Sequence, residues 1–210
     1  MVRFLSAIAA MVSCVLIGAV SAQEAKPLRG ISSAERPKLE PWYLAVGLGG
    51  AGMQYPEPLQ SDLSVLESLP NADHTAVSID LSVYFPTDTK TLVGITINGQ
   101  GDRYEYLCAT GTCWYQLNEY LLGASARRYF GAYIGRGLFV RADGGFSRIV
   151  EQYSDGSEAV SDWGLGLNAG AGYSFEIFRG TRFSIDGAYS YKRIEKDNYG
   201  AYTIGLGFMF

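Results

Sequence analysis

The stretch WGLGLNAGAGYSFE, residues 163–176, alternates between two kinds of side chain at every position. Its odd-numbered positions, from Trp163 to Phe175, hold aromatic residues, leucine or alanine, and its even-numbered positions hold glycine or a polar residue. A period of two is the pattern of a β-strand with two different faces, whereas an amphipathic helix repeats every 3.6 residues. The stretch therefore predicts a strand with one large apolar face and one small, polar face.

The same alternation recurs along the chain from Trp42 onward and predicts eight strands. In residues 75–85, for example, Val77, Ile79 and Leu81 oppose polar neighbours. No helical period competes over a comparable window. The predicted strands are residues 42–53, 75–85, 90–100, 114–129, 137–148, 163–176 and 182–193, and the C-terminal segment that ends at Phe210.

The connections between these strands alternate between long and short. The long ones are expected at 54–74, 101–113, 149–160 and 194–198, and the short ones at 86–89, 131–136 and 177–181. Short turns on one side and longer loops on the other are typical of bacterial outer-membrane barrels. Within the first long loop, residues 61–70 carry leucines at helical spacing and predict one or two helical turns.

The polarity of the two faces decides between two kinds of barrel. A soluble lipocalin-like barrel also has eight strands but hides its apolar faces inside. Small and charged side chains suit the narrow interior of an eight-stranded barrel, and large apolar ones suit lipid. Closure satisfies the backbone groups that an open sheet would leave unpaired in a bilayer. We expect an all-β fold, an eight-stranded antiparallel up-and-down transmembrane β-barrel.

Aromatic residues gather near the expected strand ends and predict two interfacial girdles. One girdle would contain Trp42, Tyr43, Phe85, Tyr129, Phe130, Phe175, Phe183, Phe208 and Phe210, and the other Trp114, Tyr115, Trp163, Tyr191 and Tyr199.

Composition excludes several classes of function. The 210 residues carry a net charge of −4 and lack a basic stripe, so no nucleic-acid partner is expected. His74 is the only histidine, which excludes a multi-histidine metal site. Residues 47–52 match G-x-G-x-x-G, but prolines follow where a dinucleotide-binding helix would begin. We expect neither a metal nor a cofactor.

The N-terminus has the features of an export signal. Arg3 precedes an uncharged apolar run, Phe4–Val20, and small residues precede a cleavage site after Ala22. The expected organisation is a signal peptide over residues 1–22, a flexible periplasmic segment over 23–41 and a barrel domain over 42–210.

Charged residues on the predicted inner face form the most informative set. Charges in a narrow, dry lumen must pair, because burying an isolated ion is costly. We expect a salt-bridged plug that holds the barrel together, with a gated polar path for small ions as the alternative. The set consists of Asp80, Glu119, Arg127, Arg141, Asp143, Glu176, Arg182, Asp186 and Lys192.

Two further features could carry chemistry. Cys108 and Cys113 lie in the second long loop, and an exported chain favours a disulfide between them over a metal site. His74 precedes a strand, with Asp73, Thr75, Ser78 and Asp80 near it in the sequence. The spacing of a catalytic triad is missing. We expect a solvated histidine and no enzymatic activity.

From residue 42 to the C-terminus the chain resembles the small outer-membrane β-barrels of Gram-negative bacteria, of the OmpA transmembrane-domain, OmpX and opacity-protein type. The resemblance rests on the eight alternating strands, on residues 137–147 and 163–175, and on the terminal strand. It implies an outer-membrane location, a monomer, and contact with outer-membrane lipids and lipopolysaccharide. It also implies periplasmic chaperones and a terminal signal for the barrel-assembly machinery, here Tyr202, Ile204, Leu206, Phe208 and Phe210.

The expected role is structural or a surface interaction carried by the extracellular loops, with a possible surface ligand. A porin-like small-solute channel is the alternative. A third reading is a lipid-A-modifying enzyme that would depend on His74, although no motif of such enzymes is present.

Overall fold

A computed structural model describes residues 39–57, 59–69, 71–109, 111–178 and 180–210 of the chain. The predicted signal peptide and nearly all of the predicted flexible segment lie outside these residues. The described residues all belong to one compact unit, which spans Lys38–Phe210.

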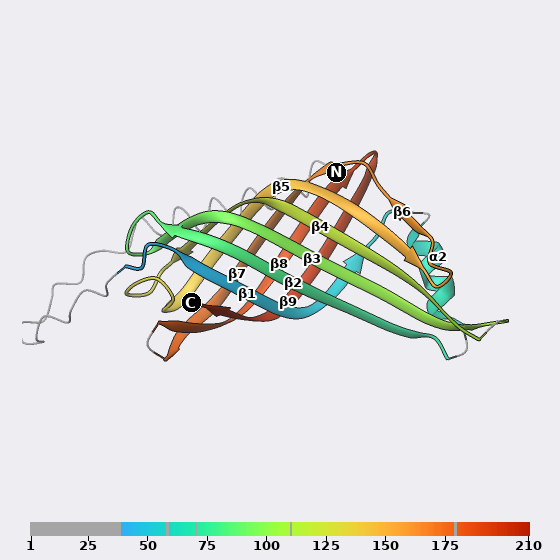
Figure 1. Cartoon of the computed structure of the whole chain (residues 1–210), viewed down its shortest axis with the longest axis horizontal. Coiled ribbons are helices and arrows are strands. Elements are labelled where there is room, and N and C mark those ends of the chain that lie inside the picture. Colours follow the sequence, from blue (N-terminus) through green and yellow to red (C-terminus); the bar gives the residue numbers. More distant parts are fainter. Residues whose placement is uncertain (1–38, 58, 70, 110, 179) are drawn as a thin grey trace, which may run out of the picture. The chain divides into compact units, whose positions relative to one another are not determined.

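Eight long strands form a closed antiparallel barrel, which confirms the predicted fold (Figure 1). Each strand pairs with its neighbours in the sequence, β1 pairs with β9, and β4 pairs with β5. A short ninth strand, β6, extends β5 on one side. The strands are β1 Tyr43–Gln54, β2 Asp73–Pro86, β3 Thr91–Cys108, β4 Gly111–Tyr129, β5 Gly137–Tyr153, β6 Glu158–Val160, β7 Gly164–Phe178, β8 Thr181–Ile194 and β9 Asp197–Met209.

The two faces of the strands point where the alternation predicted. The large apolar residues of the odd-numbered face of β7 point outward, and Leu165 is 67% exposed. On β9, Ile204 is 74% exposed on the outer face, while Ala201 on the opposite face is buried. On β3 the inward residue Thr96 is fully buried between the outward Ile95 and Ile97. The outer surface of the barrel is therefore apolar, and part of its interior is polar.

The interior has three layers. A cluster of apolar residues fills the end at which the short turns lie, and it consists of Tyr43, Ala45, Tyr84, Leu92, Tyr129, Ile134, Phe139 and Met209. A second cluster fills the opposite end, and it consists of Tyr55, Leu63, Tyr104, Tyr115, Leu117, Ile149 and Ile194. We call these the turn end and the cap end. Between them lie polar and charged side chains, so the lumen is sealed at both ends by hydrophobic packing.

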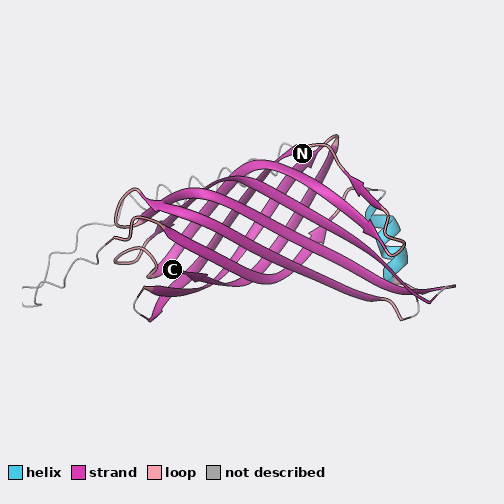
Figure 2. Cartoon of the chain, in the orientation of Figure 1, coloured by secondary structure: helices cyan, strands magenta, loops and turns pink. Residues whose placement is uncertain are grey.

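A helix covers the cap end. It is α2, Leu59–Glu67, and Leu63 on one side of it is buried in the cap-end cluster. Figure 2 shows it in cyan beside the ends of the strands. The predicted helical turns are confirmed, although the helix begins two residues before Ser61. Among the residues that the structure describes, no helix is long and apolar enough to cross a membrane.

Two of the predicted long loops are wrong. Strands β3 and β4 contain 18 and 19 residues and meet near Cys108 and Gly111, so the expected loop at 101–113 is mostly strand. Inward and outward positions continue to alternate through this segment, but they hold polar residues and tyrosines. This composition is typical of a loop. The expected loop at 194–198 is a tight turn, because Ile194 pairs with Asp197. The loop at 149–160 is shortened by β5 and by β6.

Some predicted girdle residues face inward instead. Tyr43, Tyr129 and Tyr115 are buried in the two end clusters. Their neighbours Trp42 and Phe130 are more than 40% exposed on the outer surface. An aromatic pair at a strand end places one ring on each face, since adjacent side chains point to opposite sides of the sheet.

Candidate functional site

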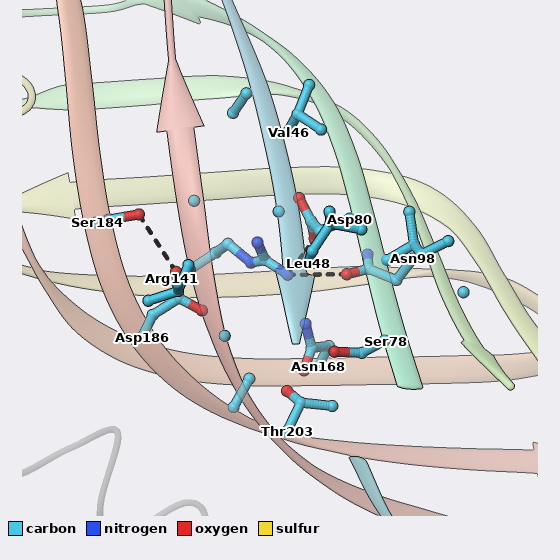
Figure 3. A pocket seen from close by; sticks show the side chains of 18 of the residues that line it. Val46, Leu48, Ser78, Asp80, Asn98, Arg141, Asn168, Ser184, Asp186 and Thr203 are labelled. Atoms are coloured by element: carbon cyan, nitrogen blue, oxygen red, sulfur yellow. Dashed lines mark hydrogen bonds and ion pairs between the residues drawn. The ribbon is translucent and has the colours of Figure 1, made fainter. Parts of the chain in front are cut away.

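The polar layer of the lumen is organised around Arg141 of β5. Its guanidinium Nη2 lies 2.6 Å from Asp80 Oδ2, and its Nε lies 3.0 Å from Asp143 Oδ2. It also donates a hydrogen bond of 2.8 Å to Asn98 Oδ1. Figure 3 shows the side chain of Arg141 reaching toward Asp80 and Asn98. One arginine thus joins three strands of the barrel, β2, β3 and β5.

Asp143 receives three more hydrogen bonds, the longest of them from the Asn98 amide at 3.5 Å. Ser125 donates to Oδ1 at 2.5 Å, and the amide of Asn168 donates to Oδ2 at 2.7 Å. These bonds compensate the buried carboxylate, because hydrogen bonds to a charged group are worth more than neutral ones. Beside them lies a cavity of about 50 Å³, lined in part by Arg127, Asn168 and Asp186. It has room for a few water molecules and is too small for a solute.

A second ion pair lies nearer the cap end. Lys192 Nζ of β8 is 2.6 Å from Glu119 Oε2 of β4, and the two side chains are 1% and 0% exposed. Lys192 also donates a short hydrogen bond to Gln100 of β3. Leu117 and Leu121 flank Glu119 on the same inward face and are fully buried. This pair closes the lumen between the polar layer and the cap-end cluster.

The remaining predicted lumen charges are arranged differently. Within the described part of the chain, Arg127 and Arg182 form no ion pair, and aromatic rings hold them instead. The Arg127 guanidinium lies 4.7 Å from the centre of the Phe139 ring, and that of Arg182 lies 4.9 Å from the Tyr43 ring. Asp186 borders the cavity and accepts a long hydrogen bond from Ser184. Glu176 is exposed at the turn end, outside the network.

The most connected carboxylate of the cap end was absent from the predicted set. Asp102 of β3 is fully buried. It accepts hydrogen bonds from Tyr55 at 2.6 Å and from Tyr104 at 2.9 Å, and it lies 2.5 Å from His74 Nε2. Asp102 lies within residues 101–113, which the composition predicts to be a loop, so the sequence prediction does not place it inward. The continuing alternation through Gln100, Asp102 and Tyr104 could have revealed it.

His74 lies between two acidic groups. Its Nδ1 is 3.2 Å from Glu67 of α2, while its Nε2 faces Asp102, and its ring stacks on Tyr104 with 4.4 Å between the ring centres. Among the described residues, no serine or threonine hydroxyl bonds to this imidazole. The two ring nitrogens thus face carboxylates on two different elements, and the imidazole links α2 to the barrel wall.

Burial also affects Tyr55, one of the two tyrosines that donate to Asp102. Tyr55 follows the last residue of β1 at the cap end. Burial, and then the negative charge of Asp102, raise the pKa of the Tyr55 hydroxyl above its ordinary value of 10.0. Tyr55 therefore stays a hydrogen-bond donor to Asp102 at neutral pH.

The two loop cysteines form a disulfide at the tip of the β3–β4 hairpin. The bond joins Cys108 at the end of β3 to Cys113 near the start of β4. Among the described residues, no group of histidine, cysteine and acidic side chains could hold a metal ion.

The predicted assembly signal lies on the outer face of β9 and on Phe210, which directly follows it. Its five side chains, Tyr202, Ile204, Leu206, Phe208 and Phe210, are all between 41% and 74% exposed. Recognition by the assembly machinery stays a prediction.

Comparison with known proteins places the fold. No protein-family model matches the chain, and no curated protein matches it. Among solved structures, the chain is similar to Neisserial surface protein A, with a TM-score of 0.53 and 15% identity over 81% of this chain and 96% of that one. It also matches Ail of Yersinia pestis, with a TM-score of 0.48 and 14% identity over 82% of this chain and 100% of that one. Such identities show the fold alone, and the chain has the fold of the small outer-membrane barrels that its sequence resembles.

Proposed function

We propose that this chain is a barrel of the bacterial outer membrane, that its lumen conducts no solute, and that it acts through contacts made by its cap end. The observation that carries this proposal is the length of the β3–β4 hairpin, whose strands contain 18 and 19 residues. A strand needs only about 9–11 residues to cross the membrane. The hairpin is therefore long enough to project well beyond the bilayer.

The outward residues support the placement of the barrel in the membrane. On β3 the outward face is apolar or glycine from Val93 to Gly101, and Arg103 is the first charged residue that follows. On β4, Arg128 lies at the opposite boundary and is exposed. This spacing fits a bilayer-facing band bounded by charged residues. The compact turns at one end fit the periplasmic side, so the cap end would face the exterior.

The tip of the hairpin has properties of a binding surface. Leu107 is 58% exposed there, and the disulfide between Cys108 and Cys113 holds the two strands together. A rigid segment loses less conformational entropy when it binds a partner. A preformed, partly apolar projection therefore favours an interaction with another surface.

A channel is less well supported by the interior. The path along the lumen meets the turn-end cluster, the Arg141 network and the buried pair of Lys192 and Glu119. Moving an ion past these layers would require breaking charge pairs in a region of low dielectric constant. Planar-bilayer recording tests this point. We expect no unitary currents, and currents that change in Arg141→Ala would favour the channel.

A lipid-modifying enzyme is also less well supported. It would need a nucleophile or a water activated by His74, whose two nitrogens face Glu67 and Asp102. We therefore propose no catalytic role. Mass spectrometry of lipid A from cells with and without the chain is the test, and altered acyl chains that revert in His74→Ala would contradict the proposal.

Shortening the hairpin tests the proposed role directly. Glu105 and Trp114 pair across the hairpin, so replacing residues 106–113 with Asn-Gly places a two-residue turn between them and keeps the register. Because the tip is partly apolar, bacteria that display the full chain should adhere to beads coated with octyl chains more strongly than bacteria with the shortened chain. The exposed β6 segment, residues 158–160, offers a control deletion at the same end. Equal adhesion of the full, shortened and empty strains would contradict the proposal.

A further inference from the structure

A groove runs along the outer face of the barrel where β3 has two glycines in place of side chains. The outward positions of β3 between Ile97 and Arg103 are Gly99 and Gly101. Side chains of β2 and β4 rise on either side and leave a groove of about 370 Å³. This volume is within the range of about 300–1,000 Å³ seen for small-molecule sites. We call it the outward groove, and it is formed by Val77, Ile79, Gly99, Gly101, Asn118 and Tyr120.

The strand register orders this groove from apolar to polar. Gly99 lies beside Ile79 and Tyr120. One step toward the cap end, Gly101 lies beside Val77 and Asn118, and Arg103 follows beside Thr75 and Gln116 in the next step. The groove therefore has an apolar end toward the middle of the membrane and a polar end at its boundary.

One cation lies at the polar end of the groove. Arg103 stacks on Trp114 at 4.7 Å and bonds to Glu105 through its Nε. A guanidinium carries five N–H donors, so this bond uses only one of them. A second arginine, Arg148, lies outside the groove, where it stacks on Trp163 at 5.0 Å. An anionic group at the membrane boundary would complement Arg103.

Side-chain amides continue this polar region. Gln116 donates to Asn118 at 2.8 Å, and Asn118 donates to Gln152 at 3.3 Å. Amides on an outward surface at the membrane boundary can exchange hydrogen bonds with sugar hydroxyls, because each amide both donates and accepts. A lipid headgroup that combines phosphate with sugar matches the amides and Arg103 together.

We propose that the outward groove binds lipid A, the phosphorylated glycolipid of lipopolysaccharide, with an acyl chain over Gly99 and Gly101 and a phosphate near Arg103. The membrane itself supplies the acyl chain, since this face of the barrel is turned toward lipid. This inference rests on the membrane placement within the proposed function, but it does not depend on what the β3–β4 hairpin binds.

The glycine floor offers a sharp test. A Cβ atom at Gly99 would lie 3.7 Å from the Tyr120 ring, an ordinary contact, so Gly99→Val should fold and fill the groove. Gly52 also points outward, on β1, with no atom within 4 Å of its Cβ position, so Gly52→Val is the matched control. Native mass spectrometry of the folded, detergent-solubilised barrel with added lipid A gives the affinity. We expect Gly99→Val to weaken binding of lipid A about tenfold, because roughly two methylene groups of the acyl chain would stay exposed. Gly52→Val should bind lipid A as the original chain does.

The headgroup is tested separately. Arg103→Gln should weaken binding of lipid A and leave binding of dephosphorylated lipid A unchanged. Arg193→Gln, which removes an exposed arginine of β8, should change neither. Equal affinity of the original chain for phosphatidylglycerol and lipid A would overturn lipid A as the occupant. Equal lipid A affinity of Gly99→Val and the original chain would overturn the site.

Folding and location are checked in the same preparations. A folded barrel migrates faster on gels before heating than after it, and each variant is compared only when it shows this shift. Should Gly99→Val not fold, Asn118→Leu alters the groove wall without touching β3, and it should weaken lipid A binding. Membrane fractionation reports on the proposed location independently, so failure there is distinguishable from failure of the groove.

Discussion

Lys192 Nζ and Glu119 Oε2 lie 2.6 Å apart across the lumen, on strands β8 and β4, which are not neighbours in the sheet. Neither side chain has meaningful contact with solvent. An ion pair in this position replaces the water that each charge loses, and it joins opposite walls of the barrel. Its two members are therefore coupled much more strongly than a surface pair would be.

Removing one member of this pair should be costly. Lys192→Met leaves the Glu119 carboxylate buried without its cation, and we expect a loss of about 3–5 kcal/mol in the free energy of unfolding. The double variant Lys192→Met, Glu119→Gln should recover most of that loss. Urea unfolding in lipid vesicles, followed by tryptophan fluorescence, measures both. Additive losses in the double variant would contradict the coupling.

His74 should hold helix α2 on the cap end. His74→Ala removes the contacts to Glu67 and Asp102 together, so the helix should exchange its amide hydrogens faster while the barrel strands keep their protection. Hydrogen–deuterium exchange with mass spectrometry resolves residues 59–67. Asp73→Asn is the matched control, because an asparagine oxygen can still accept the bond from the His74 backbone. Unchanged exchange in α2 would refute the link.

The disulfide should stabilise the hairpin tip. Replacing Cys108 and Cys113 by serine opens a short loop, and the chain-entropy relation assigns it about 2 kcal/mol. We expect faster amide exchange at the tip of the hairpin, with the membrane-facing part of the barrel unchanged. Reduction of the original chain should reproduce the effect. Protection at the tip that survives both treatments would show that strand pairing alone is sufficient.

Alkaline pH should loosen the cap through Tyr55. Its pKa is raised in the folded chain above the ordinary 10.0 by burial and by Asp102. The stability from this hydroxyl is therefore complete below pH 10 and decreases as the pH rises above 10 toward the folded pKa. Unfolding measured between pH 8 and pH 11 should show this decrease in the original chain and a smaller one in Tyr55→Phe. Parallel curves for the two chains would contradict the assignment.

Much of the architecture follows from the order of residues alone. Strict alternation in residues 163–176 predicted both the strand and its outward face, because a strand turns successive side chains to opposite sides whatever surrounds it. The inward positions of Asp80, Arg141 and Lys192 followed from the same rule. Leu63 on helix α2 could be anticipated from helical spacing in the first loop.

Other features of the site could be identified only from the closed barrel. The pairing of Lys192 with Glu119 depends on which strands face each other across the lumen, and no local pattern contains that information. Residue type alone predicts a girdle position for Tyr43 and Tyr129. Aromatic residues fit a membrane interface and a small core equally well, so this prediction cannot separate the two. Only the strand register decides which of two adjacent rings points inward.

The amino-acid sequence by itself determined the number of long strands, the polarity of their two faces and the choice of a membrane barrel over a soluble one. These properties depend on periodicity and hydrophobicity. Tertiary structure decided how far β3 and β4 extend and where Asp102 lies. It also placed His74 between Glu67 and Asp102, and it formed a groove over Gly99 and Gly101 between the side chains of β2 and β4. Those features arise from contacts between strands and helix, because closure of the sheet sets which distant side chains meet.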